Sequence, residues 1–468
     1  MEIPLTIKKL HQDLIDKKYS LVELIDRYLE RIEKFDKKIN SFITVSSCYA
    51  YKKAKELEES MNQLEDKSFK KYPLLGTVVA HKDLFCTKGL RTTAASKVLT
   101  DYVPNYSATV VNKLEEAGSI IIGKTNCDAW AHGASGENSD FGLTKNPWNK
   151  DYVPGGSSSG SAVSVAANFS MFATGTDTGG SIRQPANFTG VVGFKPTYGA
   201  VSRYGVIAIA SSLDSIGHFT RTVEDARKIF GVTKGEDLKD GTVKNTEYPK
   251  TEARLRIGIP KEYFIEGLDK DVENEVRRCS RIFEKEGIEL EEISLPHTKY
   301  AISVYYIIQP AEVSSNLARY DGIRYGEKRE MFDDEAKRRI MLGTYVLSAG
   351  YYDAYYLKAM KVRSKVIEDF EKAFKKVNAI LAPVSPTPAF KIGEKVNNPL
   401  KMYLADIFTV AANIAGIPGL TIPSGFNSKN LPLGFQLLGP RFSENILFDL
   451  GELFEKVTNY KPSIAKLS

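Results

Sequence analysis

The residues of this sequence best suited to covalent chemistry are serines that follow pairs of glycines, in the segments Gly155–Ser157 and Gly179–Ser181. Glycine lets the backbone approach a bound molecule closely and turn its N–H groups toward one point. An oxyanion hole needs such converging donors beside the reacting carbonyl. A flexible Gly/Ser linker fits less well, because apolar or helix-forming residues follow each cluster at once. The two clusters therefore favour acyl transfer by a serine nucleophile.

A second pattern, Gly118–Thr125, matches the phosphate-binding motif G-x-x-x-x-G-K-[ST] in every letter. That motif needs a strand before its first glycine and a flexible loop between the glycines, so that backbone N–H groups can surround a phosphate. Here a helical pattern precedes Gly118, and Ile120–Ile122 between the glycines reads as a strand. The context therefore predicts a helix, a glycine and a strand rather than a nucleotide site.

A third pattern, Gly156–Gly160, fits the nucleophile elbow G-x-S-x-G. An elbow of this kind depends on an acid and then a histidine later in the chain. The two histidines that follow are His218, after a loop of small residues, and His297, after a proline. Neither placement is typical of a catalytic base, so a histidine-dependent hydrolase is disfavoured, although it is not excluded.

The elements that must position these serines alternate between strands and helices. Such alternation predicts an α/β fold, a central sheet covered by helices. The first 60 residues read as helical, with a capping box at Ser20–Glu23. Strands are expected at 76–80, 120–122, 171–174, 191–194, 255–259, 378–382, 419–423 and 434–438. Helices are expected at 110–117, 161–167, 270–286, 299–316, 335–347 and 355–375. A polar excursion at 234–254 is the only candidate boundary, so one domain over residues 1–468 is expected.

The composition is that of an ordinary soluble protein, with 42% hydrophobic and 26% charged residues. The net charge of +6 is spread over 64 basic and 58 acidic residues. It forms no basic patch of the kind a nucleic-acid binder shows. The four cysteines form no CxxC pair, and no apolar run is long enough to span a membrane. We therefore expect a soluble, cytoplasmic protein.

The glycine- and serine-rich stretch resembles the amidase signature family. Gly155–Pro185 reproduces the family's GGSS segment followed by D-x-G-G-S-I-R-x-P. Upstream, Val78–Asp83 resembles the family's apolar strand that ends in a catalytic lysine. The separations are those of the family as well, since Ser157 follows Lys82 by 75 residues and precedes Ser181 by 24. The resemblance implies a single large domain with a mixed sheet covered by helices on both faces.

The resemblance also implies a catalytic role for each of three side chains. Ser181 is expected to attack the carboxamide, and Ser157, after a cis peptide bond, to relay its proton to Lys82. Backbone N–H groups of Thr178, Gly179, Gly180 and Ser181 are expected to form the oxyanion hole. Lys82 must be neutral to act as a base, against a reference pKa of about 10.4. At the end of an apolar strand, desolvation lowers that pKa, whereas a solvated surface lysine would keep it.

Within the family, the later segments resemble the A subunits of amidotransferases that act on Glu-tRNA(Gln) or Asp-tRNA(Asn). They are Lys195–Tyr204, Ser211–Asp214, Asn316–Tyr325, Lys337–Gly343 and Asp406–Val410. The resemblance implies a glutaminase in which Arg339 binds the α-carboxylate and Asp406 the α-ammonium of glutamine, with Tyr305 lining the pocket. A guanidinium suits a carboxylate, and an apolar amide would need neither charge. A surface ion-pair network remains an alternative reading of Arg339 and Asp406.

The partners follow from the same resemblance. The chain shows no ATP loop, zinc cluster or RNA-binding module, so no cofactor or metal is expected in it. ATP and magnesium are expected to serve a B subunit that also makes the main tRNA contact, within a heterotrimer completed by a small C subunit. Two alternatives remain open: a free-standing amidase for another small amide, and a scaffold without catalytic activity.

The chain departs from the family pattern at several places. Asp128–His132 reads Asp-Ala-Trp-Ala-His where Asp-Glu-Phe-Ala-Met is usual, so an acid expected near the ammonia exit is replaced by Ala129. Glu137 is a second candidate for that exit. Ser159 stands where glycine is usual, and the segment between Tyr325 and Lys337 is short. The departure at Asp128–His132 affects the expected passage of ammonia rather than the hydrolysis.

Overall fold

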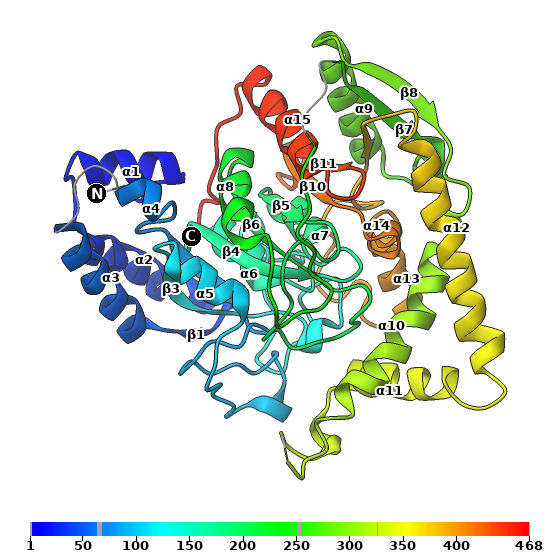
Figure 1. Cartoon of the computed structure of the whole chain (residues 1–468), viewed down its shortest axis with the longest axis horizontal. Helices are drawn as coiled ribbons and strands as arrows, with labels where there is room; N and C mark the ends of the chain where they lie inside the picture. The colour runs from blue at the N-terminus through cyan, green and yellow to red at the C-terminus, as the bar shows by residue number, and fades with distance from the viewer. Residues whose placement is uncertain (1, 63–67, 250–253, 325, 468) are drawn as a thin grey trace.

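The computed structural model of the chain describes residues 2–62, 68–249, 254–324 and 326–467 (Figure 1). Its strands are β1 Phe42–Val45, β2 Val78–Lys82, β3 Ile120–Thr125, β4 Phe172–Asp177, β5 Val192–Lys195, β6 Ser215–Thr220, β7 Arg256–Pro260, β8 Glu289–Ile293, β9 Ala379–Ala382, β10 Gly419–Phe426 and β11 Pro432–Leu438. Its longer helices are α1 Ile7–Ile15, α2 Leu21–Phe35, α3 Ser47–Asn62, α5 Thr109–Glu116, α6 Ser159–Ala166, α7 Arg183–Thr189, α8 Val223–Thr233, α9 Lys270–Lys285, α10 Ala301–Leu317, α11 Asp334–Val346, α12 Lys358–Ala373, α14 Val410–Ala415 and α15 Glu444–Val457. The short helices α4 Ser68–Lys71 and α13 Pro399–Tyr403 complete this set.

Within the described residues, the strands form one eleven-stranded sheet in the order β1-β3-β2-β4-β6-β5-β10-β11-β9-β7-β8. The sheet is mixed. Strand β2 runs parallel to both β3 and β4, and β7 runs parallel to β8 and β9, whereas the remaining pairs are antiparallel. Parallel pairs need crossover connections, and helices lie in them: α5 between β2 and β3, and α9 between β7 and β8.

Helices cover both faces of this sheet, as two neighbouring residues of β5 demonstrate. A side chain at Gly193 would meet Ala186 of α7, so this position faces that helix. The next residue, Phe194, packs on the opposite face against Phe230 of α8 and Phe448 of α15. Alternation along a strand accounts for this arrangement, and it makes the middle strands apolar on both sides. The expected α/β sheet with two helical layers is confirmed.

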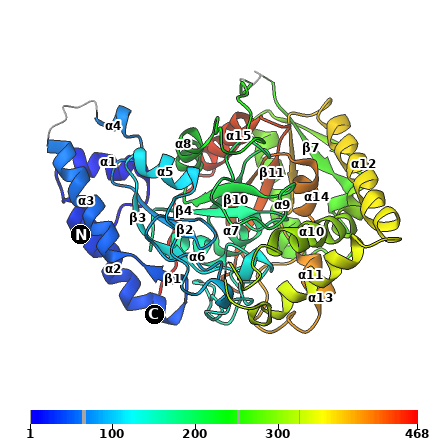
Figure 2. The same ribbon diagram turned by 60° about the horizontal axis from the view of Figure 1, so that its bottom comes forward.

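Two further groups of helices flank the sheet. Helices α1–α3 lie at one end of the molecule, beyond β1, and α10–α12 lie at the other end, as both views show (Figures 1 and 2). The active-site segments described below lie between these groups. Helix α10 contacts both α11 and α12, and it also contacts α14.

Most of the elements expected from the sequence are present, often shifted by one or two residues. The capping box is confirmed, since Ser20 accepts from the Glu23 N–H and Glu23 accepts from the Ser20 N–H. The reading of the first 60 residues as helical was wrong at β1, a four-residue strand that exists because it pairs with β3. Strand β6 was not expected, and it carries the small residues Ser215 and Gly217 without a clear alternation. The described part of 234–254 contains no helix or strand.

Candidate active site

Parallel strands position the first catalytic candidate. In β2 and β4, His81 pairs with Thr174, so the carboxyl ends of the two strands lie side by side with Lys82 and Thr176 among their last residues. Ligand sites in open α/β sheets form at this end of the strands. Helix α6 begins at Ser159, just after Ser157 and Ser158, and it packs on β2 and β4. Three separate segments therefore meet at the Lys82 side chain.

The Lys82 ammonium nitrogen lies within hydrogen-bond distance of three hydroxyl groups. Its Nζ is 2.8 Å from Ser157 Oγ, 3.0 Å from Ser158 Oγ and 2.8 Å from Thr176 Oγ1. All four side chains are buried. The Gly156–Ser157 peptide bond is cis, as the family resemblance implied.

Each hydroxyl group has one hydrogen, which limits the groups in this cluster that can donate and those that can accept. Ser158 Oγ donates to the carbonyl oxygen of Thr176 at 3.2 Å, so it must accept an N–H from Lys82. A neutral amine has two N–H donors and one lone pair. Thr176 can take the second N–H, and the lone pair is then left for the Ser157 hydroxyl. A proton relay from Ser157 to Lys82 requires this arrangement.

Burial supplies the protonation state that such a relay needs. Desolvation lowers the pKa of Lys82 to about 8, and it outweighs the opposing charges of Cys127, Asp128, Asp214 and Asp177. A lysine with this pKa is a much better base near neutrality than an exposed one, because a larger fraction is unprotonated.

The loop after β4 carries Ser181 and the expected oxyanion hole. Ser181 is nearly buried, and its carbonyl oxygen accepts from the Ser158 N–H at 3.2 Å, which joins the two serine segments. Within the described residues, the backbone N–H groups of Gly179 and Gly180 have no main-chain acceptor. These donors remain available to a developing oxyanion. The structure therefore brings together Lys82, Ser157 and the loop 178–181, as expected from the sequence.

Thr409 fixes the orientation of this loop. Its hydroxyl donates to the carbonyl oxygen of Gly179 at 2.6 Å. Because a trans peptide unit is planar, holding that carbonyl on one side turns the Gly180 N–H to the other. Gly180 has a φ of +140°, and a Cβ there would lie 2.2 Å from Thr409 Oγ1, so glycine is required at this position.

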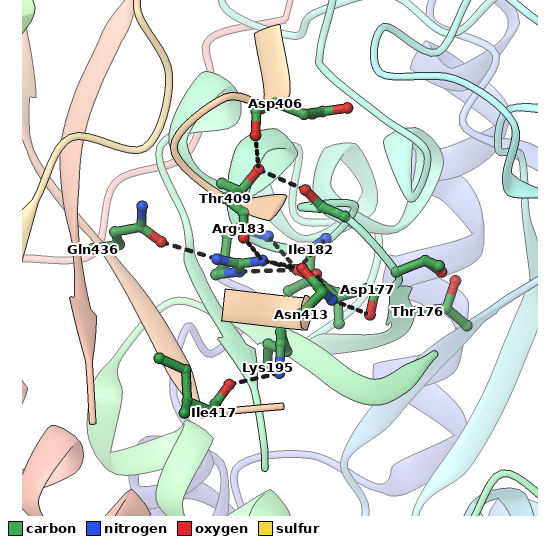
Figure 3. Close-up of polar contacts among 12 residues, drawn as sticks. Thr176, Asp177, Ile182, Arg183, Lys195, Asp406, Thr409, Asn413, Ile417 and Gln436 are labelled. Atoms are coloured by element: carbon green, nitrogen blue, oxygen red, sulfur yellow. Dashed lines mark hydrogen bonds and ion pairs between the residues drawn. The ribbon is translucent and has the colours of Figure 1, made fainter. Parts of the chain in front are cut away.

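A buried ion pair between Asp177 and Arg183 anchors the loop (Figure 3). The Asp177 carboxylate accepts from the backbone N–H of Ile182 at 3.1 Å and pairs with Arg183 Nη2 at 3.0 Å. Arg183 also donates to Asn413 Oδ1 at 2.7 Å and to Gln436 Oε1 at 3.0 Å. Burial acts to raise the pKa of Asp177, but the charge and hydrogen bonds of Arg183 outweigh it and lower the pKa to about 2. The carboxylate therefore stays ionised and holds both ends of the loop.

Two of the residues expected to bind substrate, Tyr305 and Asp406, lie beside the same loop. The Tyr305 ring packs against Gly179, since a Cβ there would lie 2.9 Å from its Cζ. The Asp406 carbonyl oxygen accepts from Thr409 Oγ1 at 3.1 Å, as Figure 3 shows. Arg339 lines a cavity of about 300 Å³ together with Tyr306 and Tyr403, and its guanidinium lies over both rings. The surface ion-pair alternative does not fit, because Arg339 and Asp406 are both buried.

Arg339 retains hydrogen-bonding capacity for a ligand. Among the described residues its hydrogen-bond partner is Glu335, which accepts from Nε at 2.8 Å, so the two terminal nitrogens are left for another acceptor. Burial opposes the charge of Arg339, yet Glu335 and the neighbouring tyrosines hold its pKa above the ordinary value. Burial and the charge of Asp177 hold the pKa of the Asp406 carboxyl well above its ordinary range. An arriving ammonium group would favour the ionised carboxylate again.

The other two sequence patterns have structural roles only. Lys124 of the phosphate-binding pattern lies on the buried strand β3 and forms an ion pair with Asp83 at 3.2 Å. His218 is buried against the Ala226 carbonyl oxygen, and His297 pairs with Asp369. None of them is near enough to Ser157 or Ser181 to share a hydrogen bond in the described part of the chain.

Four residues of the site were not identified from the sequence: Ser158, Thr176, Thr409 and Asn413. Thr176 could have been found from the register of β4 beside β2, had that pairing been known. Thr409 and Asn413 lie more than 220 residues beyond the loop they support, and no local pattern marks them.

Neither a metal centre nor a membrane span is present in the described residues. No group of three or more His, Cys, Asp or Glu side chains in this part of the chain could hold a metal ion. No helix among the same residues has both the length and the apolar character needed to cross a membrane.

Comparisons with known proteins place this geometry in context. The Amidase family model matches residues 23–448. The chain is 50% identical to the A subunit of the glutamyl-tRNA(Gln) amidotransferase of Carboxydothermus hydrogenoformans and 48% identical to that of Desulfatibacillum aliphaticivorans. These alignments cover 99% of both chains in the first case, and 97% of this chain and 98% of the relative in the second. The crystal structure of the corresponding A subunit from Thermotoga maritima superposes with a TM-score of 0.81 at 40% identity, over 95% of each chain.

Proposed function

The chain belongs to the amidase family, and from that premise we propose that it is the glutamine-hydrolysing subunit of a tRNA-dependent amidotransferase. The observation that carries the proposal is the contact of Lys82 with Ser157, beside a loop that bears Ser181 and packs against Tyr305. Relatives named as the A subunit of glutamyl-tRNA(Gln) amidotransferase match nearly the full length of the chain, which supports glutamine as the amide.

The relay accounts for the first half of the reaction. Ser181 Oγ attacks the carboxamide carbon while its proton passes to Ser157, whose own proton passes to Lys82. The oxyanion that forms accepts from backbone N–H groups of the loop 178–181. Lys82, now protonated, returns a proton through Ser157 to the departing nitrogen, which leaves as ammonia. A glutamyl ester of Ser181 remains.

Water completes the cycle by the same route. It loses a proton to the Ser157–Lys82 pair, attacks the ester carbon and releases glutamate, and Ser181 takes back the proton. No cofactor enters these steps, because serine and lysine side chains supply both the nucleophile and the base.

Arg339 and Asp406 provide the reason for choosing glutamine. We assign the terminal nitrogens of Arg339 to the α-carboxylate and the Asp406 carboxylate to the α-ammonium, with Tyr305 beside the carboxamide. The cavity wall contains three cations and three acids: Arg338, Arg339, Lys395, Asp334, Glu335 and Glu137. Balanced charges of this kind suit a zwitterionic amino acid better than an apolar amide.

We further propose that the ammonia is used by a partner. In this proposal a B subunit binds the tRNA and uses ATP and magnesium to activate the misacylated amino acid, and a small C subunit completes a heterotrimer. We place the complex in the cytoplasm. The acceptor, Glu-tRNA(Gln) or Asp-tRNA(Asn), is then selected by the B subunit.

The substitution Arg339→Ala tests the assignment of glutamine. It is expected to lower kcat/KM for glutamine by about a hundredfold or more, because a charged hydrogen-bond pair to the substrate is lost. Slow cleavage of a simple acyl amide should persist, since the relay is untouched. Full glutaminase activity in this variant would overturn the assignment of Arg339 to the α-carboxylate of glutamine.

The variant Ser181→Ala is the matching control for catalysis. It should assemble with its partners and release no ammonia. Unchanged ammonia release from this variant would assign the hydrolysis to another protein and leave the chain as a scaffold.

A further inference from the structure

His132 is the one histidine in the described chain whose two ring nitrogens are both buried without a hydrogen-bond partner. His81 and His218 are buried as well, but each bonds to a neighbour, Thr174 in the first case and Ala226 in the second. An unsatisfied buried polar group costs about 1–3 kcal/mol. A buried polar group without a partner in a native structure calls for an explanation, and a role at a functional site is one of those known.

His132 lines the cavity that also contains Arg339. Burial, and then the charge of Arg339, hold the pKa of His132 well below its ordinary value, so the ring is neutral. A neutral imidazole has one N–H donor and one acceptor nitrogen. The imidazole N–H can therefore bind the same carboxylate as the neighbouring Arg339 guanidinium, and the neutral ring adds no second full positive charge.

The backbone holds His132 in this wall. The two preceding residues, Trp130 and Ala131, have φ of 54° and 55°, a conformation that non-glycine residues rarely adopt. It is maintained by main-chain hydrogen bonds, from the Trp130 N–H to the Ala94 carbonyl oxygen at 2.9 Å and from the Ala131 N–H to the Asp128 carbonyl oxygen at 2.8 Å. Strained backbone that is over-determined by its surroundings is characteristic of functional sites.

The carbonyl oxygen of His132 is fixed as well, because Asn138 Nδ2 donates to it at 2.9 Å. Its N–H donates to the Ala129 carbonyl oxygen at 2.9 Å. Both main-chain groups are therefore satisfied within the protein, and only the ring is left for a ligand.

We propose that His132 is a substrate-recognition residue that donates an imidazole N–H to the α-carboxylate of the glutamine bound by Arg339. This inference rests on the proposed function and deepens it, because it adds a neutral donor to the carboxylate subsite. The two donors together select an amide that also carries a carboxylate.

The test measures binding in the full-length chain carrying Ser181→Ala, so that bound glutamine is not hydrolysed. Calorimetric titration with L-glutamine is compared for His132, His132→Met and His132→Gln. The Met variant should bind about tenfold more weakly or worse, because a hydrogen bond to a charged group is lost. The Gln variant keeps an N–H donor and should restore binding to within about threefold.

Two controls separate recognition from a structural effect. The probe 4-aminobutanamide lacks the α-carboxylate and should bind equally to all three variants. The substitution His218→Met removes a buried imidazole outside the cavity and should leave glutamine binding unchanged.

Three results of the binding measurements would contradict the proposed role of His132. Equal binding of glutamine to the His and Met variants overturns the role of His132 and leaves the proposed function intact. The role is also overturned if the Met variant weakens both probes alike, since a carboxylate-specific contact cannot do that. If the parent with His132 does not bind glutamine at all, the proposed function falls and this inference with it.

Discussion

At the scale of single residues, the activity of the site depends on whether the Lys82 nitrogen carries two hydrogens or three. Three hydroxyl oxygens lie within hydrogen-bond distance of Lys82 Nζ, and the Ser158 hydroxyl already donates its hydrogen to the carbonyl oxygen of Thr176. A protonated Lys82 would donate to all three and leave no lone pair for Ser157. The pH therefore determines whether the relay can start.

The expected pH dependence follows from the pKa of about 8 at Lys82. The base is active when neutral, so kcat/KM should rise as the pH increases through about 8 and level off above it. Below that pH, the rate should fall about tenfold per unit. A pH–rate profile from 6 to 10 measures this. A flat profile across the range would show that Lys82 is not the base.

Thr409 gives a second prediction at this scale. Thr409→Val removes the hydroxyl that holds the Gly179 carbonyl and should lower kcat by about tenfold or more, because the oxyanion donors are then misdirected. Thr409→Ser should restore most of the rate. Thr421→Val is the matched control, since that buried hydroxyl has no partner in the described structure. If Val at both positions lowers kcat equally, the effect is one of packing.

At the scale of elements, helix α11 carries Arg339 into the cavity and depends on a close crossing with α10. One turn after Arg339, a Cβ at Gly343 would lie 1.9 Å from the carbonyl oxygen of Pro310. Only glycine permits this approach of the two helix backbones. The crossing therefore sets the depth at which the guanidinium sits.

Gly343→Ala should push α11 away from α10 and raise KM for glutamine about tenfold, because a displacement near 1 Å weakens an oriented contact severely. Steady-state kinetics with glutamine measure the effect. Gly231→Ala in α8 is the control, since nothing lies within 4 Å of its added Cβ. There the change should leave KM unaltered and stabilise the fold by about 1 kcal/mol. An unchanged KM in Gly343→Ala would show that α11 is not held at this crossing.

Local sequence patterns predicted many of these helices and strands, but not which elements lie next to one another in the fold. The helical stripes of α2 and the apolar run of β2 are visible in the sequence, because periodicity reports which face is buried. The insertion of β6 between β4 and β5 is not, since strand order depends on contacts far apart in the chain. In the site, Lys82, Ser157 and Ser181 were indicated by the resemblance of their segments and separations to those of the amidase signature family. Thr409 has no such signal, because it acts through one hydroxyl on a distant loop.

At the scale of the whole molecule, one buried arginine joins distant parts of the sheet. Arg183 lies 253 residues from Gln436 on β11 and donates to it at 3.0 Å. Gln436 in turn donates to the carbonyl oxygens of Pro383 and Phe408 at 2.8 and 2.9 Å. Through its contact with Arg183, the Gln436 side chain therefore links the nucleophile loop to the C-terminal strands.

Gln436→Leu should lower the free energy of unfolding by about 2–3 kcal/mol, since a hydrogen bond to a buried charge is lost. Denaturant unfolding of the full-length chain measures it. Gln309→Leu is the matched control, because that buried amide has no partner within the described residues and its removal should be neutral or stabilising. Comparable destabilisation by both substitutions would contradict a special role for the Arg183 contact.

Because the contacts of Arg183 join residues far apart in the sequence, we expect them to determine when the chain becomes active during its synthesis. The serines and lysine of the relay emerge from the ribosome within the first 181 residues, but Asn413 and Gln436 follow much later. A nascent chain that stops short of β11 therefore lacks the side chains that tie its nucleophile loop in place. Ammonia release should therefore begin only after β11 has been synthesised, so that few glutamine molecules are consumed by chains that are still incomplete at this point.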